Sequence, residues 1–167
     1  YGMITSTGLP IYAPDRNYKL LLTDIFGSQN GGGVLFNLNG QVIGIITSSR
    51  NTSDLKNVVT AYGITELKKI IEKMSNGSPL PYMGISGVDV TREANEGLGV
   101  PLGAFVKDID MDSPAMQAGI QKGDVIIEAQ GLEILPFNDY TNALFTLEPG
   151  DAMELAVMRQ AQNEFKE

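Results

Sequence analysis

The sequence predicts a mainly β protein made of two small domains, and three observations support this prediction. Short apolar segments alternate with turn residues along most of the 167 residues, and the 19 glycines and 8 prolines suit many turns. Residues 35–46 carry a hairpin signal, because Asn39-Gly40 separates two apolar runs and favours a type I′ turn. The charge also changes abruptly near residue 78, which indicates a domain boundary.

The first part is expected to contain strands followed by one helix. Besides the hairpin, strands are predicted at residues 1–7, 18–24 and 57–63. A Pro/Asp/Asn loop is predicted over residues 8–17. The helix is predicted between Thr65 as its N-cap and Gly77 as its stop. Its apolar face has the helical spacing and consists of Leu67, Ile70, Ile71 and Met74.

Residues 77–81 are expected to form a linker, because glycine, serine and two prolines interrupt regular structure there. Two helical segments are predicted beyond it. The first, 113–119, has a serine cap, a proline at its first position and a glycine at its end. The second, 138–147, begins at an asparagine cap. Short apolar segments lie around these helices, at residues 82–90, 103–109, 124–130 and 152–158.

The charge distribution argues against a nucleic-acid partner. The net charge is −8, from 12 basic and 20 acidic side chains. Residues 1–78 hold 7 basic and 5 acidic side chains, a net of +2, whereas residues 79–167 hold 5 and 15, a net of −10. An acidic surface repels phosphate backbones, so no nucleic acid is expected on the second part.

The residue types present exclude several chemistries. The chain has no Cys and no His, which excludes thiol catalysis, Cys/His zinc sites and a histidine general base within this chain. Asp108, Asp110 and Asp112 alternate in a metal-like spacing but lack the glycine and closing glutamate of an EF-hand loop. They are interpreted as solvated loop charges. No metal and no cofactor are predicted, and no apolar run approaches the ~20 residues of a membrane span.

The run Ser28-Gln29-Asn30-Gly31-Gly32-Gly33 predicts a shaped loop, since glycine permits tight turns and close backbone approach. With Thr23-Asp24 before it and the hairpin after it, this run resembles the nucleophile segment of HtrA-type (Deg) serine proteases. The resemblance covers most of residues 1–76. It implies the C-terminal half of a trypsin-like, chymotrypsin-fold β-barrel. The chain is then expected to be a fragment whose N-terminal lobe, with the catalytic His and Asp, precedes Tyr1.

One departure from the family pattern decides the chemistry that this resemblance implies. The family nucleophile falls on Gly31, which has no side chain and can form no acyl-enzyme. The oxyanion-hole positions fall on Gln29 and Gly31, and the family has glycine where Gln29 stands, so these donors are also in doubt. Three interpretations stay open: a natural pseudoprotease, an engineered inactivation, and another nucleophile such as Ser28.

The second part resembles the PDZ domain that follows HtrA proteases, and residues 82–167 are assigned to it. The resemblance lies in Gly103-Ala104-Phe105-Val106, in the segment from Ser113 to Gly119, and in Lys122-Gly123-Asp124-Val125-Ile126. It implies a groove that binds an extended peptide as an added strand. A loop of backbone N–H groups would hold the peptide carboxylate. The implied peptide-binding residues are Tyr82, Met83, Gly84 and Ile85 in that loop, and Thr141, Leu144 and Phe145 on the facing helix.

Together these resemblances predict a proteolytically inactive HtrA-like protein that binds unfolded proteins through apolar C-termini. Its place would be protein quality control in the bacterial cell envelope, outside the cytoplasm, with a membrane anchor in upstream residues left open. Two alternatives remain: an active HtrA-type endopeptidase in the full-length parent, and an assembly scaffold. The lobe over residues 1–76 would expose an apolar face, so self-association or pairing with the missing N-terminal lobe is expected.

Overall fold

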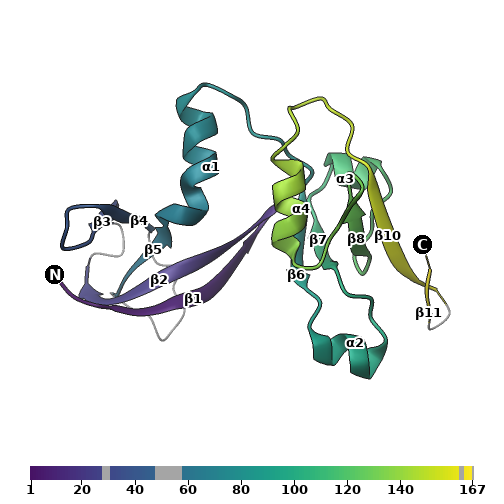
Figure 1. Ribbon diagram of the computed structural model, residues 1–167, viewed down its shortest axis with the longest axis horizontal. Helices are drawn as coiled ribbons and strands as arrows, with labels where there is room; N and C mark the ends of the chain where they lie inside the picture. Colours follow the sequence, from purple (N-terminus) through teal and green to yellow (C-terminus); the bar gives the residue numbers. More distant parts are fainter. Residues whose placement is uncertain (28–30, 48–57, 162–163, 167) are drawn as a thin grey trace. The chain divides into compact units, whose positions relative to one another are not determined.

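The chain forms two compact units in the computed structural model (Figure 1). The first unit contains residues 1–11 and 18–77, and the second contains residues 12–17 and 78–167. The short segment 12–17 therefore groups with the second unit, although it is flanked in sequence by the first. The domain bounds given above stay a prediction. The structure describes residues 1–27, 31–47, 58–161 and 164–166.

The mainly β fold class is confirmed, and the first unit is built on a five-stranded sheet with the order β1-β2-β5-β4-β3. Strand β5 pairs with β2 on one side and with β4 on the other, both antiparallel, and β4 pairs with β3. The strands are β1 (Ile4–Ala13), β2 (Arg16–Phe26), β3 (Gly33–Phe36), β4 (Val42–Thr47) and β5 (Val58–Gly63).

The loop predicted over residues 8–17 is wrong, because the structure has strand on both sides of a two-residue turn. Strand β1 continues to Ala13 and β2 begins at Arg16, so only Pro14 and Asp15 form the turn. Asp15 adopts a positive φ of 62°. Asp is among the non-glycine residues that tolerate this conformation. Proline and aspartate indicate that a turn is present, but they do not indicate how many residues it contains.

The hairpin of β3 and β4 is confirmed, but its type I′ turn is not. That turn needs positive φ at both central residues, and only Gly40 has it, at 76°. The connection instead closes with the N–H of Gly40 donating to the carbonyl of Asn37 at 3.0 Å. The side-chain oxygen of Asn37 also accepts from the N–H groups of Asn39 and Gln41. Asn37 therefore organises the turn in place of Asn39.

The predicted helix of the first unit is α1 (Ile64–Ser75), which contacts β4 and β5. Its N-cap is Gly63, which makes no side-chain hydrogen bond and lies two positions before the expected cap Thr65. Gly77 has a positive φ of 68°, as a glycine that ends a helix often does. No helix in the described part of the chain is long and apolar enough to cross a membrane.

The second unit contains a sheet with the order β11-β10-β8-β7-β6, and the short β9 pairs with β8. All of these pairs are antiparallel, and β6 is the terminal strand of the order. The strands are β6 (Ile85–Asp89), β7 (Ala104–Ile109), β8 (Val125–Ala129), β9 (Leu132–Glu133), β10 (Leu155–Ala161) and β11 (Glu164–Lys166).

Three helices accompany this sheet. Helix α3 (Pro114–Gln117) has the predicted serine cap, since the Ser113 side chain accepts from the Met116 N–H. Helix α4 (Phe137–Leu144) contacts β6, β7 and β8, and its N-cap is Pro136, so the predicted asparagine cap at Asn138 is wrong. Helix α2 (Arg92–Leu98) was not predicted, although Thr91 caps it and Gly99 ends it in the left-handed conformation. It has no buried residue, so no apolar periodicity marked it.

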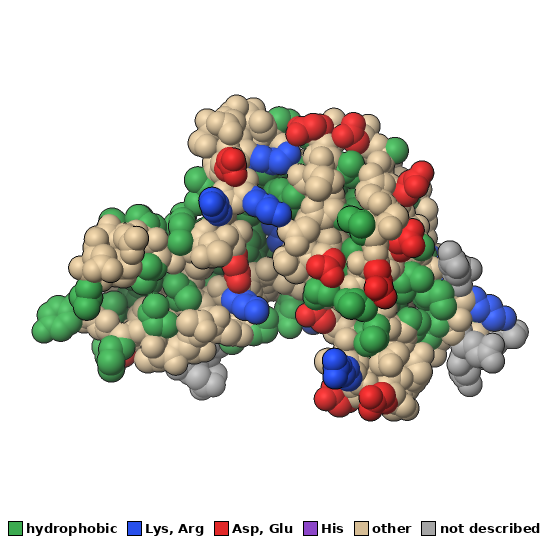
Figure 2. Space-filling model, in the orientation of Figure 1, with side chains coloured by type: hydrophobic (Ala, Val, Ile, Leu, Met, Phe, Trp, Pro, Cys, Tyr) green, Lys and Arg blue, Asp and Glu red, His purple; other side chains and the backbone are tan. Residues whose placement is uncertain are grey.

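The two units differ in how well they bury their apolar side chains. The second unit has a continuous core whose largest fully buried members are Tyr140, Phe137, Ile85, Ile126 and Ile134. In the described part of the first unit, only Leu20 and Ala61 are buried hydrophobic residues. Figure 2 shows hydrophobic side chains (green) at the surface over the strands of the first unit. The largest exposed ones include Phe26, Phe36 and Leu38.

Candidate functional site

The residues before β6 form a loop whose backbone N–H groups point to one place. Gly84 has a positive φ of 84°, which L side chains rarely adopt. A Cβ at Gly84 would lie 2.5 Å from the Cβ of Ser113, so only glycine fits against α3 here. This conformation turns successive N–H groups of the loop toward the same side and creates a concave anion site.

The carboxylate of Asp15 occupies this site. Its Oδ2 accepts from the N–H of Met83 at 2.7 Å and from the N–H of Gly84 at 2.8 Å, and its Oδ1 accepts from the N–H of Ile85 at 3.0 Å. Asp15 belongs to the second unit and is only 1% exposed. Three consecutive backbone donors therefore bind one buried carboxylate.

Asp15 and Asn17 also bind the backbone of β6. The N–H of Asp15 donates to the carbonyl of Ile85 at 2.6 Å. The side-chain amide of Asn17 donates to the carbonyl of Gly87 at 3.1 Å. Since β6 is the terminal strand of its sheet, these bonds use backbone groups at the sheet edge.

Helix α4 forms the other wall of the site. The hydroxyl of Tyr140 donates to Oδ1 of Asp15 at 2.6 Å, and the hydroxyl of Thr141 donates to the carbonyl of Asp15 at 2.9 Å. Burial, followed by the negative charge and the hydrogen bond of Asp15, raises the pKa of Tyr140, so its proton stays on the hydroxyl. The guanidinium of Arg16 lies 4.7 Å from the ring centre of Phe145.

Five of the seven residues predicted for peptide binding contact the segment 12–17. Met83, Gly84, Ile85, Thr141 and Phe145 all contact the segment 12–17, the first three through backbone N–H groups. The side chains of Ile85 and Leu144, in contrast, lie in the hydrophobic core.

Tyr82 is placed differently from the rest of the loop. Its side chain is 49% exposed, and its hydroxyl donates to Oδ2 of Asp110 at 2.7 Å. This hydrogen bond, with smaller contributions from burial and from the charges of Asp110 and Asp15, raises the pKa of Tyr82 to about 12. Tyr82 thus ties the loop to the segment after β7.

Of the positions that resemble the nucleophile loop of proteases, Gly31 lies within the described residues. Gly31 is half-buried and lies two residues before β3. Gln29 lies outside the described residues, as does Ser28. The absence of a side chain at Gly31 is a fact of the sequence and leaves no nucleophile at that position.

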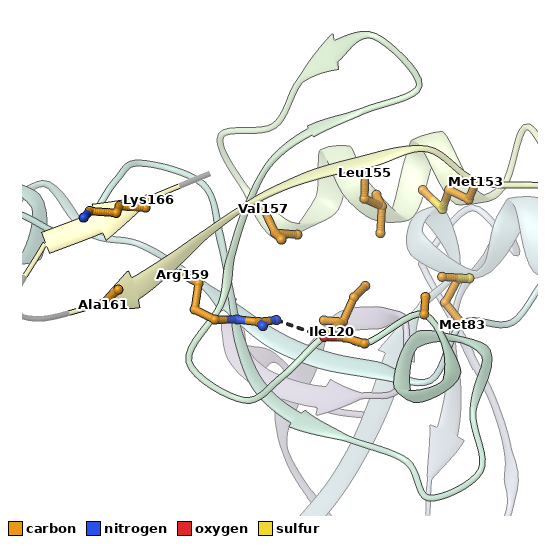
Figure 3. A pocket seen from close by; sticks show the side chains of 10 residues that line it. Met83, Ile120, Met153, Leu155, Val157, Arg159, Ala161 and Lys166 are labelled. Atoms are coloured by element: carbon orange, nitrogen blue, oxygen red, sulfur yellow. Dashed lines mark hydrogen bonds between the residues drawn. The ribbon is translucent and has the colours of Figure 1, made fainter.

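A separate pocket of about 470 Å³ opens between β10 and the segment that follows α3 (Figure 3). Met83, Ile120, Leu155 and Val157 supply apolar lining, and Arg159 and Lys166 lie toward its other end. The guanidinium of Arg159 is engaged with Asp124 and with the carbonyl of Gly119. The pocket shares only Met83 with the carboxylate site, and it includes no other residue predicted for binding.

The sequence did not indicate Asp15 or Tyr140 as site residues. Asp15 lies 68 to 70 positions before the N–H groups that it binds, so no local pattern joins them. Tyr140 stands next to the predicted Thr141 and four residues before Leu144 on the same helix. The position of Tyr140 beside the predicted residues of this helix is the one signal that could have indicated its hydroxyl.

Comparison with known proteins agrees with the architecture. Residues 81–165 match the family model described as PDZ domain. The chain is 29% identical over 170 residues to a probable periplasmic serine endoprotease DegP-like of Pseudomonas fulva, covering 95% of this chain and 34% of that protein. It is 27% identical over 174 residues to the putative serine protease HhoB of Synechocystis, covering 95% of this chain and 41% of that protein. The chain thus spans about a third of the length of such curated relatives.

A solved structure shows the same fold. The HtrA-type protease AlgW with a decapeptide superposes with a TM-score of 0.60 at 22% sequence identity, covering 99% of this chain and 52% of that one. This likeness and the PDZ match confirm the expected mainly β fold of HtrA type.

Proposed function

We propose, from the premise that this chain belongs to the PDZ domain family and is a homologue of HtrA-type serine proteases, that its second unit binds peptide carboxyl ends. One observation carries the proposal: the N–H groups of Met83, Gly84 and Ile85 converge on a single carboxylate at 2.7 to 3.0 Å. A terminal carboxylate presents the same two oxygens as the side chain bound there. Neutral backbone donors bind a carboxylate without a counter-ion.

The rest of the peptide would extend along the edge of β6, as a strand added to the sheet. The carbonyls of Ile85 and Gly87 accept hydrogen bonds from residues outside the sheet. Both carbonyls therefore point away from the sheet, where an added strand would bind. Helix α4 would contact the peptide through Thr141 and Phe145. Apolar C-termini are favoured because the ring of Phe145 is only half-buried and offers apolar surface.

We further propose that the chain acts outside the cytoplasm, in protein quality control of the cell envelope. Similarity to a protein named as a periplasmic endoprotease supports this location. Unfolded proteins expose apolar segments that folded proteins bury, so a groove that binds an apolar carboxyl end would accept them.

Proteolysis is not part of the proposal for this chain. Gly31 offers no nucleophile, and no histidine is present to act as a general base. Activity of a longer parent, with a serine elsewhere, is the competing hypothesis. Casein degradation by the full-length parent would favour it, and intact casein after prolonged incubation would favour the inactive binding protein.

The apolar surface of the first unit supports a second contact. Met3, Phe26, Phe36 and Leu38 are each more than 60% exposed, which is unusual for a sheet that stands alone. We propose that this sheet pairs with another lobe of the parent protein or with a second copy. Light scattering over a dilution series tests the second case, since a mass that falls with concentration indicates pairing of copies.

The direct test of peptide binding is a titration by fluorescence anisotropy. The probes are labelled peptides with a Gly-Ser body and a single variable last residue, namely Ala, Val, Leu, Ile, Met, Phe or Tyr. Each is made with a free carboxylate and as an amide. Binding below about 1 mM by at least one acid, with loss of binding in its amide, supports the proposal. Equal binding of acid and amide would contradict it.

A further inference from the structure

We propose that the peptide groove is occupied by the chain's own residues 12–17, with the Asp15 side chain standing in for a peptide carboxylate. A free peptide would then have to displace this segment before it binds. The inference rests on the proposed function, because it names the resident occupant of that same groove.

The three convergent N–H groups of the loop are all engaged while Asp15 is bound. The three N–H groups that would receive a terminal carboxylate each donate to Asp15 already, and the hydroxyl of Tyr140 donates to Oδ1 at 2.6 Å. A second carboxylate at this place would lack partners and would meet a like charge. Binding of Asp15 and binding of a peptide terminus therefore exclude each other.

The same segment also covers both walls of the groove. On the strand side, the backbone of Asp15 and the side chain of Asn17 use the carbonyls of Ile85 and Gly87. On the helix side, Thr141 binds the carbonyl of Asp15, and Arg16 lies over the ring of Phe145. The segment thus engages the sheet edge, the carboxylate loop and the helix together, as a bound peptide would.

The positive φ of Asp15, 62°, fits this role. Pro14 and Asp15 form the turn of the hairpin, and the conformation of Asp15 presents its carboxylate at the tip. The side chain therefore supplies the carboxylate that a peptide would supply with its C-terminus. A carboxylate that is 1% exposed is costly unless it is fully hydrogen-bonded. The four hydrogen bonds that this carboxylate accepts, from three loop N–H groups and from the hydroxyl of Tyr140, offset that cost.

Covalent attachment makes the internal occupant a strong competitor. A tethered ligand acts at an effective concentration of about millimolar or more, whereas a free peptide competes at its own concentration. The apparent dissociation constant rises as the fraction of open groove falls. We therefore expect removal of the Asp15 carboxylate to tighten peptide binding by about tenfold or more.

The experiment compares the full chain with Asp15→Asn and Asp15→Ala, using the acid and amide probes described above. Asp108→Asn is the matched control, since it removes an exposed carboxylate from the same unit. Tighter binding of at least one acid probe by both Asp15 variants, with the amide probes and the control unchanged, supports the inference. Equal affinity of the wild type and both variants for the acid probes overturns it and leaves the proposed function standing.

Amide hydrogen exchange gives a second measurement that needs no peptide. In the wild type, the N–H groups of Met83, Gly84 and Ile85 should be protected, and Asp15→Asn should speed their exchange by about tenfold or more. Rapid exchange in the wild type would overturn the inference. Faster exchange in the variant without binding of any probe would keep the self-occupied groove and reject peptide recognition.

Arg16→Ala keeps the test decisive if the Asp15 variants fail to fold. It removes the contact with Phe145 but leaves the carboxylate in place. The affinity of Arg16→Ala for the acid probes should rise, but by less than that of the Asp15 variants, because only one contact of the segment 12–17 is removed. No change in affinity, together with rapid exchange at Gly84, would overturn the proposal.

Discussion

The guanidinium of Arg159 binds both carboxylate oxygens of Asp124. Its Nε lies 2.7 Å from Oδ1 and its Nη2 lies 2.7 Å from Oδ2, while Nη2 also donates to the carbonyl of Gly119 at 2.9 Å. Asp124 is 1% exposed, and it also accepts from the N–H of Gln121. This bidentate pair joins β10 to the turn before β8 beside the pocket of Figure 3.

Asp124→Asn should therefore destabilise the second unit by about 1–3 kcal/mol, because it removes the buried charge that the Arg159 guanidinium binds. Urea unfolding followed by circular dichroism measures this change. Arg159→Lys should have a smaller effect in the same direction, since an ammonium can replace the charge but not the fork of two donors. A free energy of unfolding unchanged in Asp124→Asn would contradict the structural role of the pair.

The same carboxylate predicts a pH dependence. Burial opposes ionisation of Asp124, but the hydrogen bonds from Arg159 and Gln121 prevail and lower its pKa below the ordinary value of 3.8. The folded state therefore binds this proton less readily than the unfolded state, and the stabilisation is fully present above pH 3.8. It should be lost as the pH falls through the lowered pKa.

Unfolding free energies of the wild type and Asp124→Asn over a series of acidic pH values check this dependence. Their difference should be constant near neutral pH and should shrink below pH 3.8. A difference that stays constant down to the acid transition would mean that Asp124 titrates normally.

Local signals explain what the sequence predicted correctly about the fold. Ser113, Pro114 and Gly119 mark α3 because a cap, a first-turn proline and a terminal glycine each act within one helical turn. The β3–β4 hairpin follows equally from short-range alternation. Its turn type did not follow, because the side chain of Asn37 competed with the expected Asn39-Gly40 geometry.

The carboxylate site could be predicted only in part, because half of it is non-local. The loop before β6 was found through its resemblance to a known motif, and the helix wall through the i, i+4 pair Thr141 and Phe145. Its occupant was not found, since Asp15 lies 69 positions from Gly84 and the segment around it was expected to be a loop. A buried carboxylate at the end of a hairpin has no sequence signature.

Tyr82 provides a test in the alkaline range. Its hydrogen bond to Asp110 is the largest cause of a pKa raised to about 12, so the folded state holds this proton more tightly than the unfolded state. The associated stabilisation is present below pH 10 and should be lost as the pH rises through about 12. The tyrosinate absorbance of the wild type minus that of Tyr82→Phe isolates this residue, and Asp110→Asn should move its midpoint toward 10.

Gly84→Ala should disable the carboxylate loop and destabilise the second unit together. The new Cβ would lie 2.5 Å from the Cβ of Ser113 and would require a positive φ of 84° from alanine. We expect a loss of about 2–4 kcal/mol from strain and overpacking combined. Urea unfolding measures the stability, and hydrogen exchange at Met83 and Ile85 reports whether the loop still holds its ligand.

Gly99→Ala is the matched control for this change. Gly99 also has a positive φ, 66°, but a Cβ there meets nothing within 4 Å. It should cost only about 1 kcal/mol, from backbone strain alone, and should leave exchange at Met83 and Ile85 unchanged. If the two variants lose equal stability, the contact with Ser113 does not restrict position 84, and the loop owes its shape to the positive φ of Gly84 alone.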